Sequence, residues 1–513
     1  MKPKSISSIK RHRAAKMAKI ATKAVYLQRK GDNIAMANYI CDELVLLGGI
    51  YIKFLQGVML QSEFFKQWTS PSRLNIFENL DSELLDVNQI LRTELGPSEL
   101  AQINQVQPQS FAAGSFGQVY YGTLTDGSPV VIKVLRPLVR ETLQFDLRLL
   151  GIFSKQFFKK LYENIQINPD TAIKEFKRAS LNETDYVAEA NFANELYLAY
   201  KDNDELLIPK TYLNLSTKNI IVQEYIGGIS AAQLIKQNEQ GIDPYDYVKE
   251  VLGSDLDQQL IELGSQYFYG MFTLPRIQGD PHPGNVKLLD KNQIGLIDFG
   301  IDAPSPKDKP AFFGLIKEYS NIYSGKLDIE ELFGKFLNVF ANDLYNAFRK
   351  LSEVRDGGNS DGLTKAIGKL ANKTFMSRVK TSNSAAMMSD PNIIKLINKV
   401  VNDQNRFGIE LSLESTEMLR AAQTYINLVE SLGRKDQVLP IVFTKSIAKL
   451  EHDHPELVIE KTSNMTVARA INIITKWLER VANRDPVLFR RLISYVKGNS
   501  SLSDLNKFEK ENI

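Results

Sequence analysis

Apolar positions change their spacing along the chain, and each change marks a predicted element. From Ile34 to Leu100 they recur at intervals of three and four residues, the period of amphipathic helices. Between Phe111 and Val134 two β-rich runs are joined by an Asp-Gly turn, which predicts a hairpin. Helical spacing returns from Leu138 to Tyr200, and Asn219 to Tyr225 predicts a further strand. Almost everything after Gly300 has helical spacing.

The first 31 residues combine a regular apolar stripe with a strong positive charge. They hold ten Lys or Arg and no Asp or Glu, while Met17, Ile20, Ala24 and Leu27 recur on one helical face. Three roles are open for this segment. It is an anchor on an anionic membrane surface, a transit peptide, or a charged helix that packs through its apolar stripe.

The composition is that of a folded globular protein, because 43% hydrophobic residues suffice for a core. The 63 Lys and Arg nearly balance the 60 Asp and Glu, which argues against a nucleic-acid partner. Cys41 is the only cysteine, so we expect a buried thiol and a reducing compartment. No segment reaches the ~18 apolar residues of a spanning helix. These features predict a cytoplasmic protein, with peripheral attachment to a membrane as the open alternative.

The predicted hairpin contains a candidate phosphate-binding loop. The run A-A-G-S-F-G-Q-V follows the protein-kinase pattern G-x-G-x-x-G-x-V at every fixed position except the first, where alanine replaces glycine. Small residues are needed there because backbone N–H groups must approach the nucleotide phosphates closely. The alternative is a glycine-containing hairpin without a ligand. The residues assigned to ATP are Ala112, Ala113, Gly114, Ser115, Phe116, Gly117 and Val119.

A lysine and a glutamate are predicted to complete the phosphate site. The run V-V-I-K ends at Lys133, fourteen residues after Val119, where a third-strand lysine pairs with the α- and β-phosphates. A helix glutamate normally holds such a lysine, and Glu189 is the candidate. We interpret the run from Glu183 to Asn191 as helical, with Glu189 offset from the helix face that carries Glu183. The 56 residues between Lys133 and Glu189 predict an insertion.

The strongest signal is G-D-P-H-P-G-N, Gly279 to Asn285, followed by I-D-F-G. Asp280 and Asn285 keep the five-residue spacing of Asp and Asn in the kinase catalytic loop. Asp280 would orient or accept the proton of an attacking hydroxyl, whereas Asn285 and Asp298 would hold Mg²⁺ through oxygen atoms. His282, between two prolines, is expected to shape the turn.

Together these motifs resemble the UbiB/AarF family of atypical protein-kinase-like proteins, over most of residues 35–300. The resemblance includes V-Q-E-Y-I-G-G, whose Glu224, Tyr225 and Ile226 are assigned to ATP. It implies an α+β, bilobal protein-kinase-like fold with an N-terminal helical extension, inserted helices and a mostly helical C-terminal lobe and tail. It also implies ATP and Mg²⁺ as cofactors.

Two further family motifs are implied by this resemblance. In the family a K-x-G-Q motif on the helical extension folds over the active site and meets an E-x-D motif in the inserted region. Here Lys53 and Gln56 occupy the first motif, and Glu183 and Asp185 the second, all with a regulatory role. Leu55 replaces the family's glycine, so we expect looser coverage of the site.

The pattern and the resemblance predict five parts. A polar break, Asp356 to Gly362, divides the C-terminal helices. The parts are a basic amphipathic segment (1–31), the helical extension (32–107), a kinase-like N-lobe with a helical insertion (108–228), a kinase-like C-lobe with the catalytic and metal-binding loops (229–350), and a helical C-terminal region (363–513).

Two classes of function remain open. The first is an Mg-ATP-dependent ATPase or phosphotransferase acting on a small or lipid-associated acceptor, because no A-P-E platform for a protein substrate follows Gly300. The alternative is a catalytically quiet ATP-dependent switch or scaffold for a membrane-associated biosynthetic complex. A small-molecule kinase of the aminoglycoside or choline type would not explain Lys53 and Glu183. The resemblance favours isoprenoid quinone or lipid metabolism, and hence a lipid or isoprenoid-like partner beside ATP.

Overall fold

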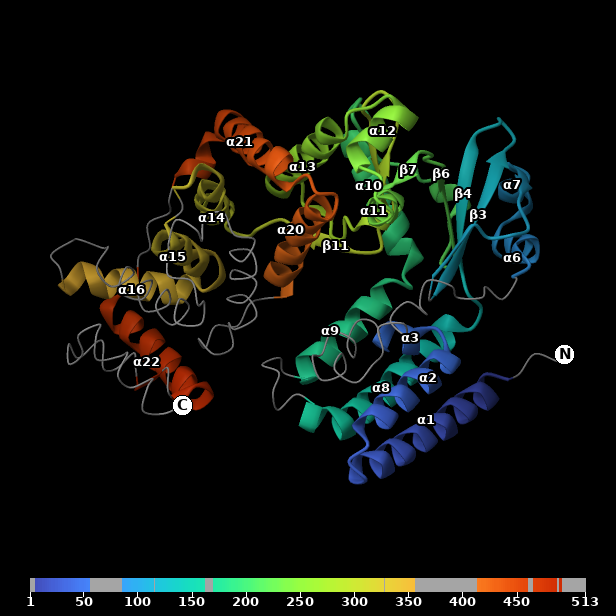
Figure 1. Cartoon of the computed structure of the whole chain (residues 1–513), viewed down its shortest axis with the longest axis horizontal. Helices are drawn as coiled ribbons and strands as arrows, with labels where there is room; N and C mark the ends of the chain where they lie inside the picture. Colours follow the sequence, from blue (N-terminus) through green and yellow to red (C-terminus); the bar gives the residue numbers. More distant parts are fainter. Residues whose placement is uncertain are drawn as a thin grey trace. The chain divides into compact units, whose positions relative to one another are not determined.

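The computed structural model describes residues 5–55, 85–114, 116–161, 169–326, 328–355, 413–459, 465–486 and 489–490. The chain forms two compact units, residues 1–254 with 280–302, and residues 255–279 with 303–513 (Figure 1). Three predictions fall outside the described residues, namely the roles of Gln56 and Ser115 and the break from Asp356 to Gly362.

The first unit contains a five-stranded antiparallel sheet in the order β1–β3–β4–β6, with β2 paired to β3. Its strands are β1 (Ile103–Val106), β2 (Ala112–Ala113), β3 (Gly117–Leu124), β4 (Pro129–Leu135) and β6 (Ile220–Glu224). The predicted hairpin is β3–β4, and Gly127 adopts φ +89° in its turn. Ile132 and Val134 are buried on one face of β4, so Lys133 leaves the opposite face, directly across from Val119.

A second, four-stranded sheet in the same unit has the order β5–β10–β9–β7. Its strands are β5 (Leu206–Leu207), β7 (Ile229–Ser230), β9 (Val286–Leu288) and β10 (Ile294–Leu296). The antiparallel pair β9–β10 brings Asn285, just before β9, next to Ile297, whose N–H donates to the carbonyl of Asn285 at 2.9 Å. This pairing brings Asn285 and Asp298 to the same end of the sheet.

Residues 225–228 link the two sheets, since they run from β6 to β7. Gly228 adopts φ +77° in this link, and a Cβ added to it would lie 2.2 Å from the carbonyl oxygen of Leu288. A side chain at this position would therefore force the linking segment away from β9.

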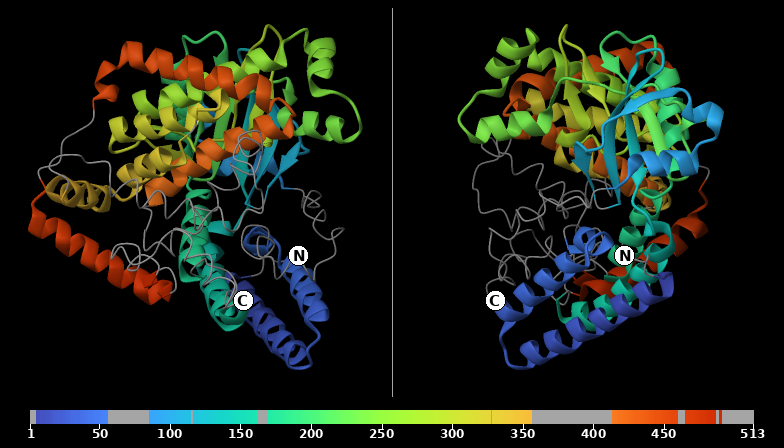
Figure 2. Two further views of the ribbon diagram at one scale, coloured as in Figure 1. Left: turned by 60° about the vertical axis from the view of Figure 1, so that its left-hand side comes forward. Right: turned by 90° about the vertical axis from the view of Figure 1, so that its right-hand side faces the viewer.

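Helices of the N-terminal extension and of the insertion share one hydrophobic core (Figure 2). The helices of this layer are α1 (Ile6–Arg29), α2 (Asn33–Leu47), α3 (Ile50–Phe54), α8 (Val139–Leu161) and α9 (Pro169–Asn182). Met17, Ile20 and Ala24 of α1 are buried in this core, as is Cys41, in agreement with the predicted buried thiol. Of the three roles open for the basic segment, packing through the apolar stripe is the one that the structure supports.

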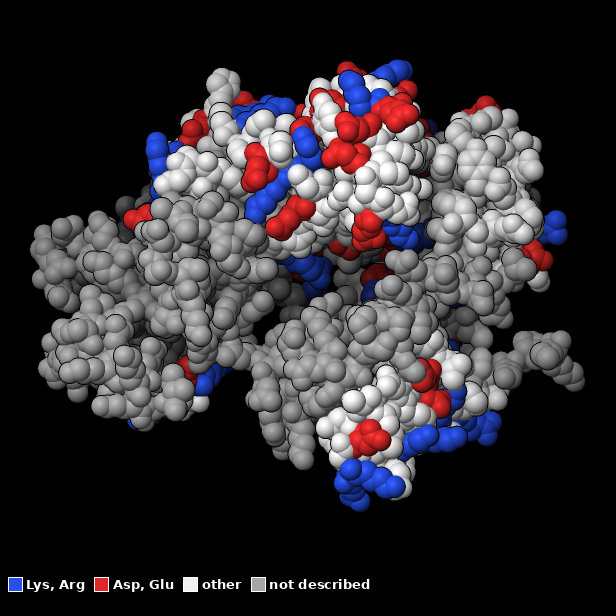
Figure 3. All heavy atoms as spheres, in the orientation of Figure 1, with Lys and Arg blue, Asp and Glu red and all other residues white. Residues whose placement is uncertain are grey.

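The opposite face of α1 stays exposed and carries most of its charge. Lys19, Lys23, Arg29 and Lys30 are exposed, and Figure 3 shows Lys and Arg side chains gathered along this helix.

The remaining helices of the unit are α6 (Val87–Glu94), α7 (Pro97–Leu100), α10 (Tyr186–Tyr200), α11 (Ala231–Glu239), α12 (Pro244–Leu252) and the short η3 (Leu213–Leu215) and η4 (Pro283–Asn285).

The second unit is mostly helical, as predicted for the C-terminal region. Its elements are α13 (Leu256–Thr273), β8 (Arg276–Gln278), β11 (Asp302–Pro304), α14 (Lys309–Ser320), η5 (Asn321–Ser324), α15 (Ile329–Phe340), α16 (Asn342–Arg355), α20 (Leu413–Ser431), α21 (Lys435–Asp453), η6 (Pro455–Val458) and α22 (Val467–Arg484). Packing of α13 against α21 brings the rings of Phe268 and Phe443 to 4.9 Å. Within the described ranges, every helix is too short or too polar to cross a membrane.

Candidate functional site

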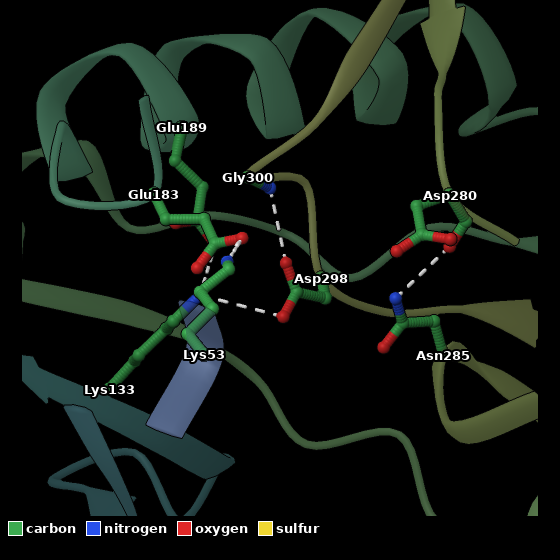
Figure 4. Close-up of polar contacts among 8 residues, drawn as sticks. All are labelled: Lys53, Lys133, Glu183, Glu189, Asp280, Asn285, Asp298 and Gly300. Atoms are coloured by element: carbon green, nitrogen blue, oxygen red, sulfur yellow. Dashed lines mark hydrogen bonds and ion pairs between the residues drawn. The ribbon is translucent and has the colours of Figure 1, made fainter. Parts of the chain in front are cut away.

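Lys133 is the centre of a charged cluster in the first unit (Figure 4). Its Nζ donates to Oε1 of Glu189 on α10 at 2.7 Å and lies 3.6 Å from Oδ2 of Asp298. The same ammonium lies 5.3 Å from the ring centroid of Tyr186, which favours the charged form through a cation–π contact. The structure therefore brings together Lys133, Glu189 and Asp298, three residues that the sequence analysis assigned to one site.

Burial and neighbouring charges shift the pKa values of this cluster in opposite directions. Burial raises the pKa of Glu189, whose side chain is only 2% exposed, and the neighbouring Lys133 acts in the opposite direction. Partial withdrawal from water also disfavours the charged form of Asp298, but Lys133 and the N–H of Gly300 hold the pKa of this carboxyl below its ordinary value. Asp298 and Glu189 together overcome burial and raise the pKa of Lys133. We therefore expect Lys133 and Asp298 to be charged at neutral pH.

The backbone of Asp298 adopts an uncommon conformation that aims its side chain. Its φ is +70°, in the left-handed region that few residues other than glycine occupy. Phe299 beside it is buried and packs edge-to-face on Phe192 of α10, with ring centroids 6.2 Å apart. Oδ1 of Asp298 accepts the N–H of Gly300 at 3.1 Å, while the side chain stays 47% exposed. Its carboxylate is thus fixed and still accessible to a ligand.

The loop before β9 places Asp280 and Asn285 together. Nδ2 of Asn285 donates to the backbone oxygen of Asp280 at 3.1 Å, which leaves the amide oxygen of Asn285 to accept or to ligate. Nδ1 of His282 accepts the N–H of Gly284 at 2.9 Å, so His282 shapes this turn, as expected from its position between prolines. In Figure 4 the side chain of Asp298 lies between the Asp280–Asn285 pair and the Lys133–Glu189 pair.

The candidate phosphate loop turns tightly between β2 and β3. Ala112 and Ala113 form β2 and are exposed, and the N–H of Gly114 donates to the carbonyl of Gly117 at 2.9 Å. A Cβ added to Gly117 would lie 2.5 Å from the hydroxyl of Tyr186 and 2.9 Å from the carbonyl oxygen of Val134. Glycine at this position lets the loop approach the base of α10.

Phe116 at the tip of this loop joins the core of the helical extension. Its side chain is buried in the same cluster as Ile50, Tyr51 and Phe54 of α3. The ammonium of Lys53 lies 5.5 Å from the centroid of the Phe116 ring. The loop and the extension therefore share side-chain packing, which the sequence did not reveal.

Lys53 forms an ion pair with Oε1 of Glu183, so the two family motifs meet beside the Lys133 cluster (Figure 4). Asp185 has a different task. Its Oδ1 accepts the N–H of Ala188 at 3.2 Å and caps α10, which begins at Tyr186. Glu183 therefore precedes the helix, and the interpretation of Glu183 to Asn191 as one helix is wrong. The cap explains why the helix begins at Tyr186 and not at Glu183. The Asp185 side chain accepts a backbone N–H that has no partner within the first turn of the helix.

An ion pair with a buried carboxylate fixes the extension to α8. Asp146 accepts hydrogen bonds from Arg13 of α1 and, at 2.8 Å, from the hydroxyl of Tyr51 on α3. Its side chain is 2% exposed, and burial raises its pKa while Arg13 opposes the shift. The sequence analysis missed these residues, because the only sequence signal would have been an acidic residue within the apolar spacing of α8.

The end of β6 and the segment linking the two sheets hold the three remaining residues assigned to ATP. Glu224 is exposed, and its Oε2 accepts the backbone N–H of Lys210 at 3.2 Å. The ring of Tyr225 contacts the rings of Tyr121 and Phe111 edge-to-face at 5.2 and 6.5 Å. Ile226 packs toward Gly295 of β10. The N–H groups of Glu224 and Tyr225 donate to the carbonyls of Lys210 and Pro129, at 2.9 and 3.0 Å.

Comparison with known proteins identifies the domain. Residues 79–317 match the model of the ABC1 atypical kinase-like domain. The chain is 31% identical over 212 residues to the chloroplastic protein ACTIVITY OF BC1 COMPLEX KINASE 1 of Arabidopsis thaliana, covering 41% of this chain and 29% of that protein. It is 24% identical over 279 residues to a probable protein kinase UbiB of Vibrio cholerae, covering 54% and 49%.

The matched regions span half or less of these curated relatives, from 29% to 50% of their length. Among solved structures, the Rv3197–erythromycin complex from Mycobacterium tuberculosis matches 73% of this chain and 83% of its own, at 19% identity and a TM-score of 0.45. The described helices and strands are those of an α+β protein-kinase-like fold, as predicted. Residues 79–317 of the chain therefore carry an ABC1 atypical kinase-like domain, which is similar to proteins named UbiB and ACTIVITY OF BC1 COMPLEX KINASE.

Proposed function

We propose that this protein binds Mg-ATP and is an ATPase or a phosphotransferase for a small or lipid-associated acceptor. The observation that carries the proposal is the cluster of Lys133, Glu189 and Asp298 beside the Asp280–Asn285 loop. The side-chain oxygen atoms at this site fit Mg²⁺. Amide and carboxylate oxygens of Asn285 and Asp298 are the ligands that Mg²⁺ prefers. Oε2 of Glu189 is buried and lacks a hydrogen-bond partner among the described residues, so the cluster is not internally complete.

Each side chain would have a separate task. Lys133, held by Glu189, would contact the α- and β-phosphates, and the Ala112–Gly117 loop would cover them. Asn285 and Asp298 would hold Mg²⁺, which when bound neutralises charge on the phosphates. Asp280 would orient the hydroxyl of the acceptor or a water molecule. Because α14 begins at Lys309, soon after Gly300, a docking platform for a protein substrate has little room, which supports a small acceptor.

A test of nucleotide binding follows from the fixed position of Asp298. MgATP at a hundred times its dissociation constant is expected to stabilise the wild type by about 2.7 kcal/mol. Asp298→Asn is expected to lose the Mg²⁺-dependent part of this stabilisation, because the substitution removes the charged metal ligand. Thermal unfolding with ATP, with and without Mg²⁺, measures both, and exposed Asp290→Asn is the matched control. No stabilisation of the wild type at millimolar MgATP would refute the proposal.

The second candidate function is a nucleotide-dependent switch for a membrane-associated biosynthetic complex in isoprenoid quinone or lipid metabolism. It is favoured by the packing of Phe116 in the core of the extension and by the Lys53–Glu183 ion pair. A loop that closes on phosphates while packed against α3 would change the stability of the extension. The same residues would then serve as a sensor rather than as an enzyme.

Hydrogen exchange can test this coupling. In the wild type, MgATP is expected to change the exchange rate of the α3 amides by about tenfold, equivalent to ~1.4 kcal/mol. Lys53→Met is expected to reduce that change by removing the ion pair to Glu183. Lys16→Met removes a comparable pair within the extension, Lys16 Nζ to Glu43 Oε2 at 3.3 Å, and should leave the response intact. If bound MgATP leaves the exchange of α3 unchanged, the switch is excluded.

A further inference from the structure

The hydroxyl of Tyr186 is a polar group of the site that none of the roles above explains. Tyr186 is the first residue of α10, and only 1% of its surface is exposed. Its ring belongs to the hydrophobic core that the helical extension shares with Phe116 of the phosphate loop. The hydroxyl of a buried tyrosine usually has a hydrogen-bond partner. Among the residues that the structure describes, the hydroxyl of Tyr186 makes no hydrogen bond.

Two neighbours place this hydroxyl in the part of the site assigned to phosphates. A Cβ added to Gly117 would lie 2.5 Å from the Tyr186 oxygen, so the hydroxyl faces the backbone of the phosphate loop. The ammonium of Lys133, beside Glu189 and Asp298 in Figure 4, lies 5.3 Å from the centroid of the Tyr186 ring. Tyr186 therefore adjoins both elements that would contact the phosphates, the loop and the ammonium.

The hydroxyl is available as a donor at neutral pH. Burial raises the pKa of Tyr186 above its ordinary value, and the carboxylates of Glu189 and Asp298 act in the same direction, while Lys133 opposes them. The phenol therefore keeps its proton. Ionised oxygen atoms, such as those of a phosphate, accept stronger hydrogen bonds than neutral oxygen atoms do.

We propose that Tyr186 donates a hydrogen bond to a phosphate oxygen of the bound nucleotide, as a phosphate-contacting residue beside Lys133. Packing of the ring in the core fixes the hydroxyl in advance, so the contact costs little side-chain ordering on binding. The contact would also join the nucleotide to the core of the helical extension. The inference rests on the proposed function, because it requires nucleotide phosphates in the site.

Tyr186→Phe tests the contact, because it keeps the buried ring and removes only the hydroxyl. The substitution is expected to weaken MgADP binding about tenfold in calorimetric titrations of the full chain, the value of one hydrogen bond to a charged acceptor. Tyr120→Phe is the matched control. Tyr120 is equally buried on β3, but it pairs with Ile132 on the opposite face of the sheet, where its hydroxyl donates to Gln118. The control should bind MgADP as the wild type does.

Fluorine NMR provides a readout that packing alone would not change. With 3-fluorotyrosine incorporated at position 186, the fluorine resonance should move on addition of MgADP. Magnesium tripolyphosphate should move it in the same direction, at concentrations that stabilise the protein, because the contact is with phosphate. A resonance that responds to MgADP and not to bound tripolyphosphate would overturn the assignment to phosphate.

The outcomes separate this inference from the proposed function. If MgADP stabilises the protein but Tyr186→Phe binds it as tightly as the wild type, the tyrosine contact is wrong and the nucleotide site stands. A loss of affinity with an unmoved resonance, or an equal loss in Tyr120→Phe, also overturns the contact, because the loss would then reflect packing. If MgADP neither stabilises the protein nor moves the resonance, the proposed function and this inference fall together.

Discussion

Asp280→Asn is expected to lower phosphate release from MgATP by about 10²- to 10⁴-fold, the usual contribution of a positioned general base. The substitution removes the carboxylate that would orient the attacking hydroxyl. It keeps the backbone oxygen of Asp280, which accepts the amide of Asn285 at 3.1 Å. MgATP binding should therefore remain close to that of the wild type. Steady-state phosphate release and thermal stabilisation, measured on the same preparations, separate the two effects.

The matched control is Asp290→Asn, at an exposed position of the β9–β10 turn in the same unit. It should release phosphate at the wild-type rate. Equal turnover in wild type and Asp280→Asn would show that the assignment of Asp280 is wrong. Binding of MgATP without turnover in the wild type would favour the nucleotide-dependent switch, because an intact site would then serve regulation alone.

Asp146→Ala is expected to lower the free energy of unfolding by about 3 kcal/mol, since it breaks a buried ion pair by removing one partner. Arg13 and the Tyr51 hydroxyl would both lose their acceptor, in a core shared by α1, α3 and α8. Asp146→Asn still accepts from Tyr51 and should lose less. Denaturant unfolding of the wild type and both variants gives these free energies.

A second ion pair in the same helical layer provides the control for Asp146. Glu43→Ala breaks the contact of Glu43 with Lys16, whose side chains are 19% and 28% exposed, and ion pairs that keep contact with water contribute ~0–1 kcal/mol. Equal, small losses in Asp146→Ala and Glu43→Ala would contradict the view that the buried pair holds the extension in place. Unchanged nucleotide binding in both variants would add that the extension is dispensable for the site.

Features that depend on neighbours in the sequence could be predicted. The hairpin β3–β4 follows from alternation and an Asp-Gly turn, and the structure confirms it. Asn285 lies beside Asp280 because the two residues are five positions apart in one tight loop. The one local error, Glu183 within a helix, arose because helical spacing continues across the cap that Asp185 provides.

The sequence alone determined the α+β class, the order of the motifs and the apolar stripe of α1, because periodicity and turn chemistry act over a few residues. Only the tertiary structure decided which distant residues come into contact. Lys133 and Glu189 are 56 positions apart, and Lys53 and Glu183 are 130 apart. Such contacts depend on which faces of distant helices and strands pack together, and spacing along the chain carries no information about that packing.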